Sequence, residues 1–103
     1  MEININGLKY VIVEVENIES KDDTHVIGCT DYINQKILLL KSLSKEQKKI
    51  TLRHELCHAF LWAHGLGSLD TYTLEIVCDF LGIYSEQIVN ISNEYFNRET
   101  VVD

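Results

Sequence analysis

The sequence predicts a single α+β domain in which a small N-terminal antiparallel sheet is followed by helices. Apolar residues alternate over residues 2–16, which is typical of strands, whereas Ile88, Ile91 and Tyr95 recur at helical spacing near the other end. The length of 103 residues, with 46% hydrophobic and 24% charged residues, is that of one globular unit. We therefore expect residues 1–103 to form one domain with one core.

Four strands are expected in the first half of the chain. The Asn6-Gly7 pair lies between the first two, and it is the strongest short signal for a hairpin because both central residues of a type I′ turn need a positive φ. A polar, acidic loop over 17–25 and a turn over 32–35 make the later connections. The strands are expected at about residues 2–5, 8–16, 26–31 and 36–41.

The second half is expected to be helical. Ser44 is the predicted N-cap of a helix of about 20 residues, with Gln47 completing a capping box, and Gly65 and Gly67 should end this helix near His64. Two further helices are expected, from Ser68 or Asp70 to about Leu81 and from Ser85 to about Phe96, with Gly82 as the break between them and a frayed tail over 97–103.

Charge and hydropathy exclude some classes of function. The net charge of −7 argues against direct nucleic-acid binding, which needs a basic face. No apolar run has the length of a membrane span, and the N-terminus lacks the pattern of a signal peptide, so the expected location is the cytoplasm. The cysteines Cys29, Cys57 and Cys78 lack C-x-x-C spacing and are expected to be reduced, buried apolar residues.

The stretch from His54 to His58 reads H-E-x-x-H. Histidines four residues apart lie on one face of a helix, roughly 40° apart around its axis, so both rings can reach one Zn²⁺ ion. Glu55 then occupies the general-base position of a metalloprotease. The alternative is an ordinary helix with surface histidines, but the apolar flanks predict a buried helix, in which these three polar side chains would need a partner such as a metal.

A catalytic zinc site typically has three protein ligands, and two candidates for the third follow the motif. His64 has the metzincin spacing, but Leu61 stands where that family has a glycine, and in a continued helix His64 points about 120° away from His58. Glu75 is the favoured candidate. Asp79, four residues later on the same helix face, could accept a hydrogen bond from the far nitrogen of a zinc histidine. This Glu75–Asp79 pair resembles the gluzincin arrangement of thermolysin-like peptidases.

Taken together, the predicted sheet, the His-Glu-Leu-x-His helix and the downstream glutamate resemble the minimal zincins of phages and mobile elements, in particular the ImmA/IrrE-like metallopeptidases. The resemblance implies a zincin-like fold with one Zn²⁺ per chain, held by His54, His58 and Glu75, and with Glu55 as catalytic base. Cys57 stands where many relatives have glycine. Members of known role cleave helix-turn-helix repressors, so the implied partner is a protein substrate, a transcriptional regulator of a phage or mobile element.

The expected reaction is hydrolysis of a peptide bond, with Glu55 moving a proton from the attacking water to the leaving amine. His64, Tyr72 and Tyr84 are unranked candidates for stabilising the oxyanion. By analogy with zincins, residues 36–41 or 26–31 would offer an edge strand to the substrate. Full pairing of both strands, together with a metal closed off from solvent, would contradict this expectation. The alternative function is a metal-containing zincin-fold module that binds a regulator without turnover. A His₂Glu site also accepts Mn²⁺ or Fe²⁺.

Overall fold

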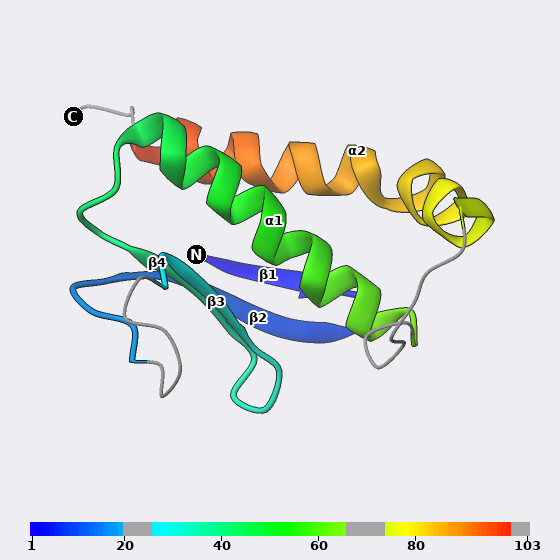
Figure 1. Cartoon of the computed structure of the whole chain (residues 1–103), viewed down its shortest axis with the longest axis horizontal. Coiled ribbons are helices and arrows are strands. Elements are labelled where there is room, and N and C mark those ends of the chain that lie inside the picture. Colours follow the sequence, from blue (N-terminus) through cyan, green and yellow to red (C-terminus); the bar gives the residue numbers. More distant parts are fainter. Residues whose placement is uncertain (20–25, 66–73, 100–103) are drawn as a thin grey trace.

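The structure, a computed structural model, describes residues 1–19, 26–65 and 74–99, without the side chains of residues 74–79, 82 and 99. It is an α+β arrangement of two layers, in which both helices lie on the same side of one four-stranded sheet (Figure 1). The elements are β1 (Glu2–Ile5), β2 (Leu8–Val15), β3 (Gly28–Asp31), β4 (Lys36–Leu40), α1 (Lys45–Ala63) and α2 (Leu74–Glu99).

The β1–β2 hairpin forms where the Asn6-Gly7 pair predicts it. Asn6 has a φ of 50° and Gly7 a φ of 92°, the two positive values that a type I′ turn requires. The strands pair antiparallel, with Ile5 opposite Leu8 and Glu2 opposite Val11. Local turn chemistry therefore sets the register of the first two strands.

The sheet as a whole is mixed, and the expectation of an antiparallel sheet is wrong in one pairing. The strand order is β1-β2-β4-β3, and β4 pairs parallel with β2 and antiparallel with β3. The long connection after β2 lets the chain place β3 at the edge and return with β4 in the interior. The most apolar runs, in β2 and β4, thus take the central positions, as parallel pairs usually do.

The core lies between the inner face of the sheet and the two helices. Tyr10 and Ile12 of β2 and Ile37 and Leu39 of β4 point into it, and each is at most 3% exposed. The helices complete it with Leu52, Leu56, Ala59 and Phe60 from α1 and Phe80, Tyr84, Ile88, Tyr95 and Phe96 from α2. The described residues thus share one core, which both helices cover from the same side.

Helix α1 begins and ends as predicted, but it is less buried than expected. The Ser44 hydroxyl oxygen accepts a hydrogen bond from the Gln47 backbone N–H at 3.2 Å, and His64 caps the other end. The side chains of Ile50 and Trp62 are 71% and 46% exposed. Only one face of α1 packs on the sheet and α2, so its apolar composition does not make it a fully buried helix.

Helix α2 is one continuous element where two were expected. Gly82 and Ser85 both lie inside this helix. The predicted break at Gly82 and the predicted start of a third helix at Ser85 are therefore wrong. An interior glycine costs about 1 kcal/mol relative to alanine. Phe80, Tyr84 and Ile88 lie four residues apart on one side and are each 5% exposed, and burying each contributes about 1.5–3 kcal/mol, which outweighs that cost.

The first, yellow turns of α2 run in a different direction from the orange and red remainder (Figure 1). The alternative starts predicted for this segment, Ser68 and Asp70, lie outside the described residues.

Among the residues that the structure describes, no helix is both long and apolar enough to span a membrane.

Candidate metal and catalytic site

His54 and His58 project from the exposed side of α1 and are directed at one another. Their Nε2 atoms are 3.1 Å apart, and the rings meet edge to face with centroids 4.8 Å apart. Both side chains are exposed, so the expectation that they lie inside a buried helix is wrong. Water can solvate both rings, so the two histidines do not need a metal to compensate for burial.

The spacing of the two nitrogens nevertheless fits two ligands of one zinc ion. With Zn–N bonds of about 2.0–2.1 Å and tetrahedral angles, two ligand nitrogens lie about 3.3–3.4 Å apart. The observed 3.1 Å is within a few tenths of an ångström of that value. A direct hydrogen bond between two neutral rings also suits this distance, provided that one Nε2 carries a proton and the other does not.

The third ligand remains a prediction. Among the described residues, no group of three or more histidine, cysteine, aspartate or glutamate side chains could hold a metal ion. Glu75 and Asp79 belong to the first turns of α2, but their side chains lie outside what the structure describes, and so does the whole of Tyr72. Of the three predicted ligands, His54 and His58 are the two whose side chains the structure describes.

His64 and Tyr84, two of the residues expected near the oxyanion, are brought together at the C-terminal end of α1. The helix continues through Ala63, which places His64 about 9 Å further along the axis than His58. His64 Nδ1 lies 2.9 Å from the Tyr84 hydroxyl, which also accepts a hydrogen bond from Asn6 Nδ2 at 2.8 Å. These contacts join both helices to the β1–β2 turn.

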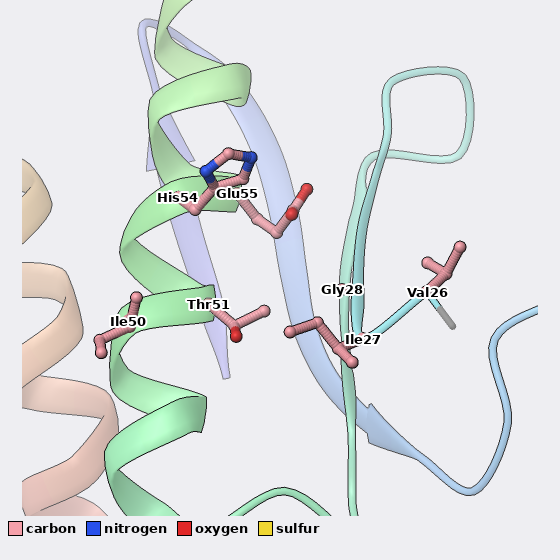
Figure 2. A pocket seen from close by; sticks show the side chains of 7 residues that line it. All are labelled: Val26, Ile27, Gly28, Ile50, Thr51, His54 and Glu55. Carbon is pink, nitrogen blue, oxygen red and sulfur yellow. The ribbon is translucent and has the colours of Figure 1, made fainter. Parts of the chain in front are cut away.

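Glu55 is held between α1 and the edge strand β3. Its side chain is 8% exposed and reaches from the helix toward β3, with the His54 ring beside it (Figure 2). The Thr30 hydroxyl lies 2.8 Å from Glu55 Oε1 and 3.0 Å from the Glu55 backbone oxygen, and donates to them. The carboxylate therefore has a fixed partner on the strand.

Gly28 allows α1 to lie this close to β3. A Cβ atom at residue 28 would lie 2.5 Å from Thr51 Cγ2 and 3.2 Å from Glu55 Oε2. The first distance is shorter than real Cβ contacts, so a larger residue here would require the Thr51 side chain or the backbone to shift. Gly28 thus sets the width of the gap in which the Glu55 carboxylate lies.

A pocket of about 360 Å³ opens between α1 and the N-terminal end of β3 (Figure 2). Two of its lining residues are the sequence-predicted His54 and Glu55, and most of the others are apolar. The lining consists of Val26, Ile27, Gly28, Ile50, Thr51, His54 and Glu55. The polar groups of the motif therefore border a cavity large enough for a substrate side chain.

Among the described residues, strand β3 pairs only with β4, so it lies at the edge of the sheet, beside this pocket. Of the two segments expected to offer an edge to a substrate, residues 36–41 are therefore excluded, because β4 is paired on both sides. An edge strand such as residues 28–31 is a position at which an extended peptide could add a further strand.

The cysteines near the site are half-buried rather than buried. Cys29 and Cys57 are free thiols, while the side chain of Cys78 lies outside the described part of the chain. Burial raises the pKa of both thiols, and the carboxylates of Glu55 and Asp31 raise that of Cys29 further. Thiols that stay protonated at neutral pH are weak metal ligands and weak nucleophiles.

Thr30 is the site residue that sequence reasoning missed. It lies 25 positions from Glu55, and no local pattern connects the two residues. Gly28 did carry a signal, because an isolated glycine within a strand often marks the close approach of another backbone. The contact itself depends on tertiary packing.

Comparison with known proteins adds no family. No family model, no curated protein and no solved structure matches this chain.

Proposed function

We propose that this chain is a zinc-dependent endopeptidase of zincin-like fold, similar to the ImmA/IrrE-like metallopeptidases. The observation that carries the proposal is the exposed pair of His54 and His58, whose Nε2 atoms lie 3.1 Å apart beside the oriented carboxylate of Glu55. A metal site needs converging nitrogens, and a hydrolase also needs a base next to them. The motif brings both together within one turn and a half of α1.

In this proposal His54, His58 and Glu75 hold one zinc ion, and Asp79 accepts a hydrogen bond from a ligand histidine. The bound ion would supply Lewis acidity toward the scissile carbonyl and lower the pKa of the attacking water. Glu55 takes the proton of that water and passes it to the leaving nitrogen. His64, Tyr72 and Tyr84 stay candidates for contacts with the oxyanion.

The proposed substrate is a protein segment in extended conformation. It would pair with the edge of β3 that faces away from β4 and pass over the pocket between β3 and α1, as in recognition by β-augmentation. From the resemblance to ImmA/IrrE-like proteins, we propose that this segment belongs to a helix-turn-helix repressor in the cytoplasm. The net charge of −7 favours a protein partner over nucleic acid.

A second function is supported by the burial of Glu55. A carboxylate that is 8% exposed and bonded to Thr30 also resembles one that joins a helix to a strand. The second candidate is therefore a metal-containing module that binds a regulator without turnover. Glu55→Gln separates the two functions, because it keeps the shape and an acceptor oxygen but removes the base.

The experiment begins with the metal content of protein purified without chelator, for the wild type and for His58→Ala and Glu75→Ala. We expect about one zinc per chain in the wild type and loss of zinc in both variants. Zinc that is retained in Glu75→Ala would move the third ligand elsewhere. The absence of metal from the wild type would contradict both candidate functions.

Turnover is then measured with a repressor substrate or a peptide library, using Glu55→Gln as the matched variant. The peptidase proposal expects zinc retention and loss of turnover by several orders of magnitude, since this variant removes the base. Substrate binding that persists in both proteins without any cleavage would favour the binding module instead.

A further inference from the structure

We propose that Thr30 is a positioning residue that holds Glu55 in the orientation needed for catalysis. The inference rests on the proposed peptidase function and adds a residue from a different element to the site. Its basis is the 2.8 Å contact between the Thr30 hydroxyl and Glu55 Oε1, made across the gap between β3 and α1.

The contact is directional and favours one arrangement of the carboxylate. A threonine hydroxyl has one proton to donate, and here it is shared between Glu55 Oε1 at 2.8 Å and the Glu55 backbone oxygen at 3.0 Å. The bond to the carboxylate oxygen is the shorter of the two, and a carboxylate is a stronger acceptor than a backbone carbonyl. Thr30 therefore selects the orientation in which Oε1 faces the strand.

The other oxygen of the carboxylate is confined as well. Glu55 Oε2 lies 3.2 Å from the position that a Cβ atom would take on Gly28, so it lies against the backbone of the same strand. A glutamate side chain has three rotatable bonds, and on an open helix face it would sample many rotamers. The hydroxyl of Thr30 and the bare backbone of Gly28 together reduce these to one arrangement.

Strand β3 itself is a firm support for this arrangement. Thr30 lies opposite Ile37 of β4, a fully buried residue in the interior of the sheet. The opposite edge of β3 is the one that we propose for the substrate. One strand would thus fix both the base and the substrate backbone, and a displacement of the base by about 1 Å can lower the rate by a factor of about 100.

The test compares Thr30→Val, which keeps the shape and removes the hydroxyl, with Thr30→Ser, which keeps the hydroxyl. We expect Thr30→Val to lower kcat by a factor of about 10 to 100, with KM and zinc content close to those of the wild type. Thr30→Ser should keep kcat within about threefold of the wild-type value. Ser92→Ala is the matched control, because it removes a fully buried hydroxyl that bonds Arg53 on another face of α1.

A double-mutant cycle gives a readout that does not depend on turnover. In zinc-free protein, Thr30→Val and Glu55→Ala should have non-additive effects on the midpoint of urea unfolding, because each removes the same hydrogen bond. Additive effects would contradict the contact. In the Glu55→Gln background, Thr30→Val should cause no further loss of turnover, since the base that it positions is already absent.

The outcomes separate this inference from the function on which it rests. An active wild type with unchanged kcat in Thr30→Val, or with equal losses in Thr30→Val and Thr30→Ser, would overturn the positioning role and leave the peptidase intact. A wild type that binds no zinc and cleaves no substrate would overturn the peptidase, and the positioning role with it.

Discussion

Polar side chains on the two sides of α1 have different roles. On the side toward α2 and the sheet, Lys48 Nζ lies 2.8 Å from Glu14 Oε1, and Arg53 Nε donates to Ser92 Oγ at 3.3 Å. On the open side, His54 and His58 are exposed and directed at one another. The packed side uses its charges to join elements, whereas the open side leaves nitrogens accessible to a ligand.

Glu55 combines features of both sides of α1. It is buried and bonded to another element, as the packed side is, yet it borders the open pocket beside the histidines. A catalytic base needs this combination, because it has to be held still and still reach the substrate. The packed side should therefore govern stability, and the open side should govern metal binding.

The largest expected difference between the two sides is in the free energy of unfolding, which we compare for Phe60→Ala and His58→Ala. Phe60 is fully buried, with its ring centroid 4.9 Å from that of Tyr84. Its truncation should lower the free energy of unfolding by about 3–5 kcal/mol, because it leaves a cavity in the core. His58→Ala should change the unfolding of zinc-free protein by less than about 0.5 kcal/mol.

Urea unfolding in the presence of chelator measures both variants under the same conditions. When zinc replaces the chelator, it should stabilise the wild type and Phe60→Ala but not His58→Ala, because only His58→Ala lacks a ligand. Equal destabilisation by Phe60→Ala and His58→Ala in the zinc-free state would show that the histidine pair also supports the fold, and the proposed division between the two sides would fail.

A smaller effect is expected at the charge network of the packed side. Glu14 accepts hydrogen bonds from Lys48 and from the Tyr95 hydroxyl, so it joins β2 to both helices. The side chains of the Lys48–Glu14 pair are only 17% and 16% exposed. Glu14→Ala should cost about 3 kcal/mol of stability, because it leaves a largely buried ammonium group without its counter-charge.

The matched control for Glu14→Ala is Glu16→Ala. Glu16 pairs with Lys41 at 3.7 Å, but these side chains are 81% and 62% exposed, and such surface pairs contribute about 0–1 kcal/mol. Thermal unfolding of both variants measures the contrast. If the two variants have the same midpoint, the network does not join the helices to the sheet.

The parts of the fold that the sequence predicts are those set by local chemistry. The positive φ values of Asn6 and Gly7 make the first hairpin, and the Ser44 hydroxyl starts α1 where its capping pattern lies. His54 and His58 likewise meet because residues four apart share a helix face. Each of these features depends on residues within a few positions of one another.

The remaining features depend on partners that are distant in the sequence. Gly82 predicts a break by its propensity, but the buried stripe of aromatic residues on either side keeps α2 continuous. The apolar flanks of the motif predict burial, yet Ile50 is 71% exposed because the core covers only one side of the helix. The bond from Thr30 to Glu55 requires β3 to lie beside α1, and this packing has no local signal.

The smallest expected effect concerns the turn that follows β3. Asp31 accepts hydrogen bonds from Asn34, through its backbone and its side chain, and from the backbone of Ile33. These bonds hold the pKa of Asp31 below its ordinary value, with the Asn34 backbone bond the largest cause. Because the folded pKa lies below the unfolded one, this stabilisation is present above the unfolded pKa and is lost as the pH falls through the folded pKa.

Asp31→Asn should therefore be slightly less stable than the wild type at pH 6, and the difference should shrink as the pH is lowered from about 5 to below the folded pKa. The measurement is urea unfolding of zinc-free protein at a series of pH values. A difference that stays constant over this range would mean that the turn does not depend on the ionised carboxylate. Since the bonds lie within one turn, zinc binding at neutral pH should be the same in both proteins.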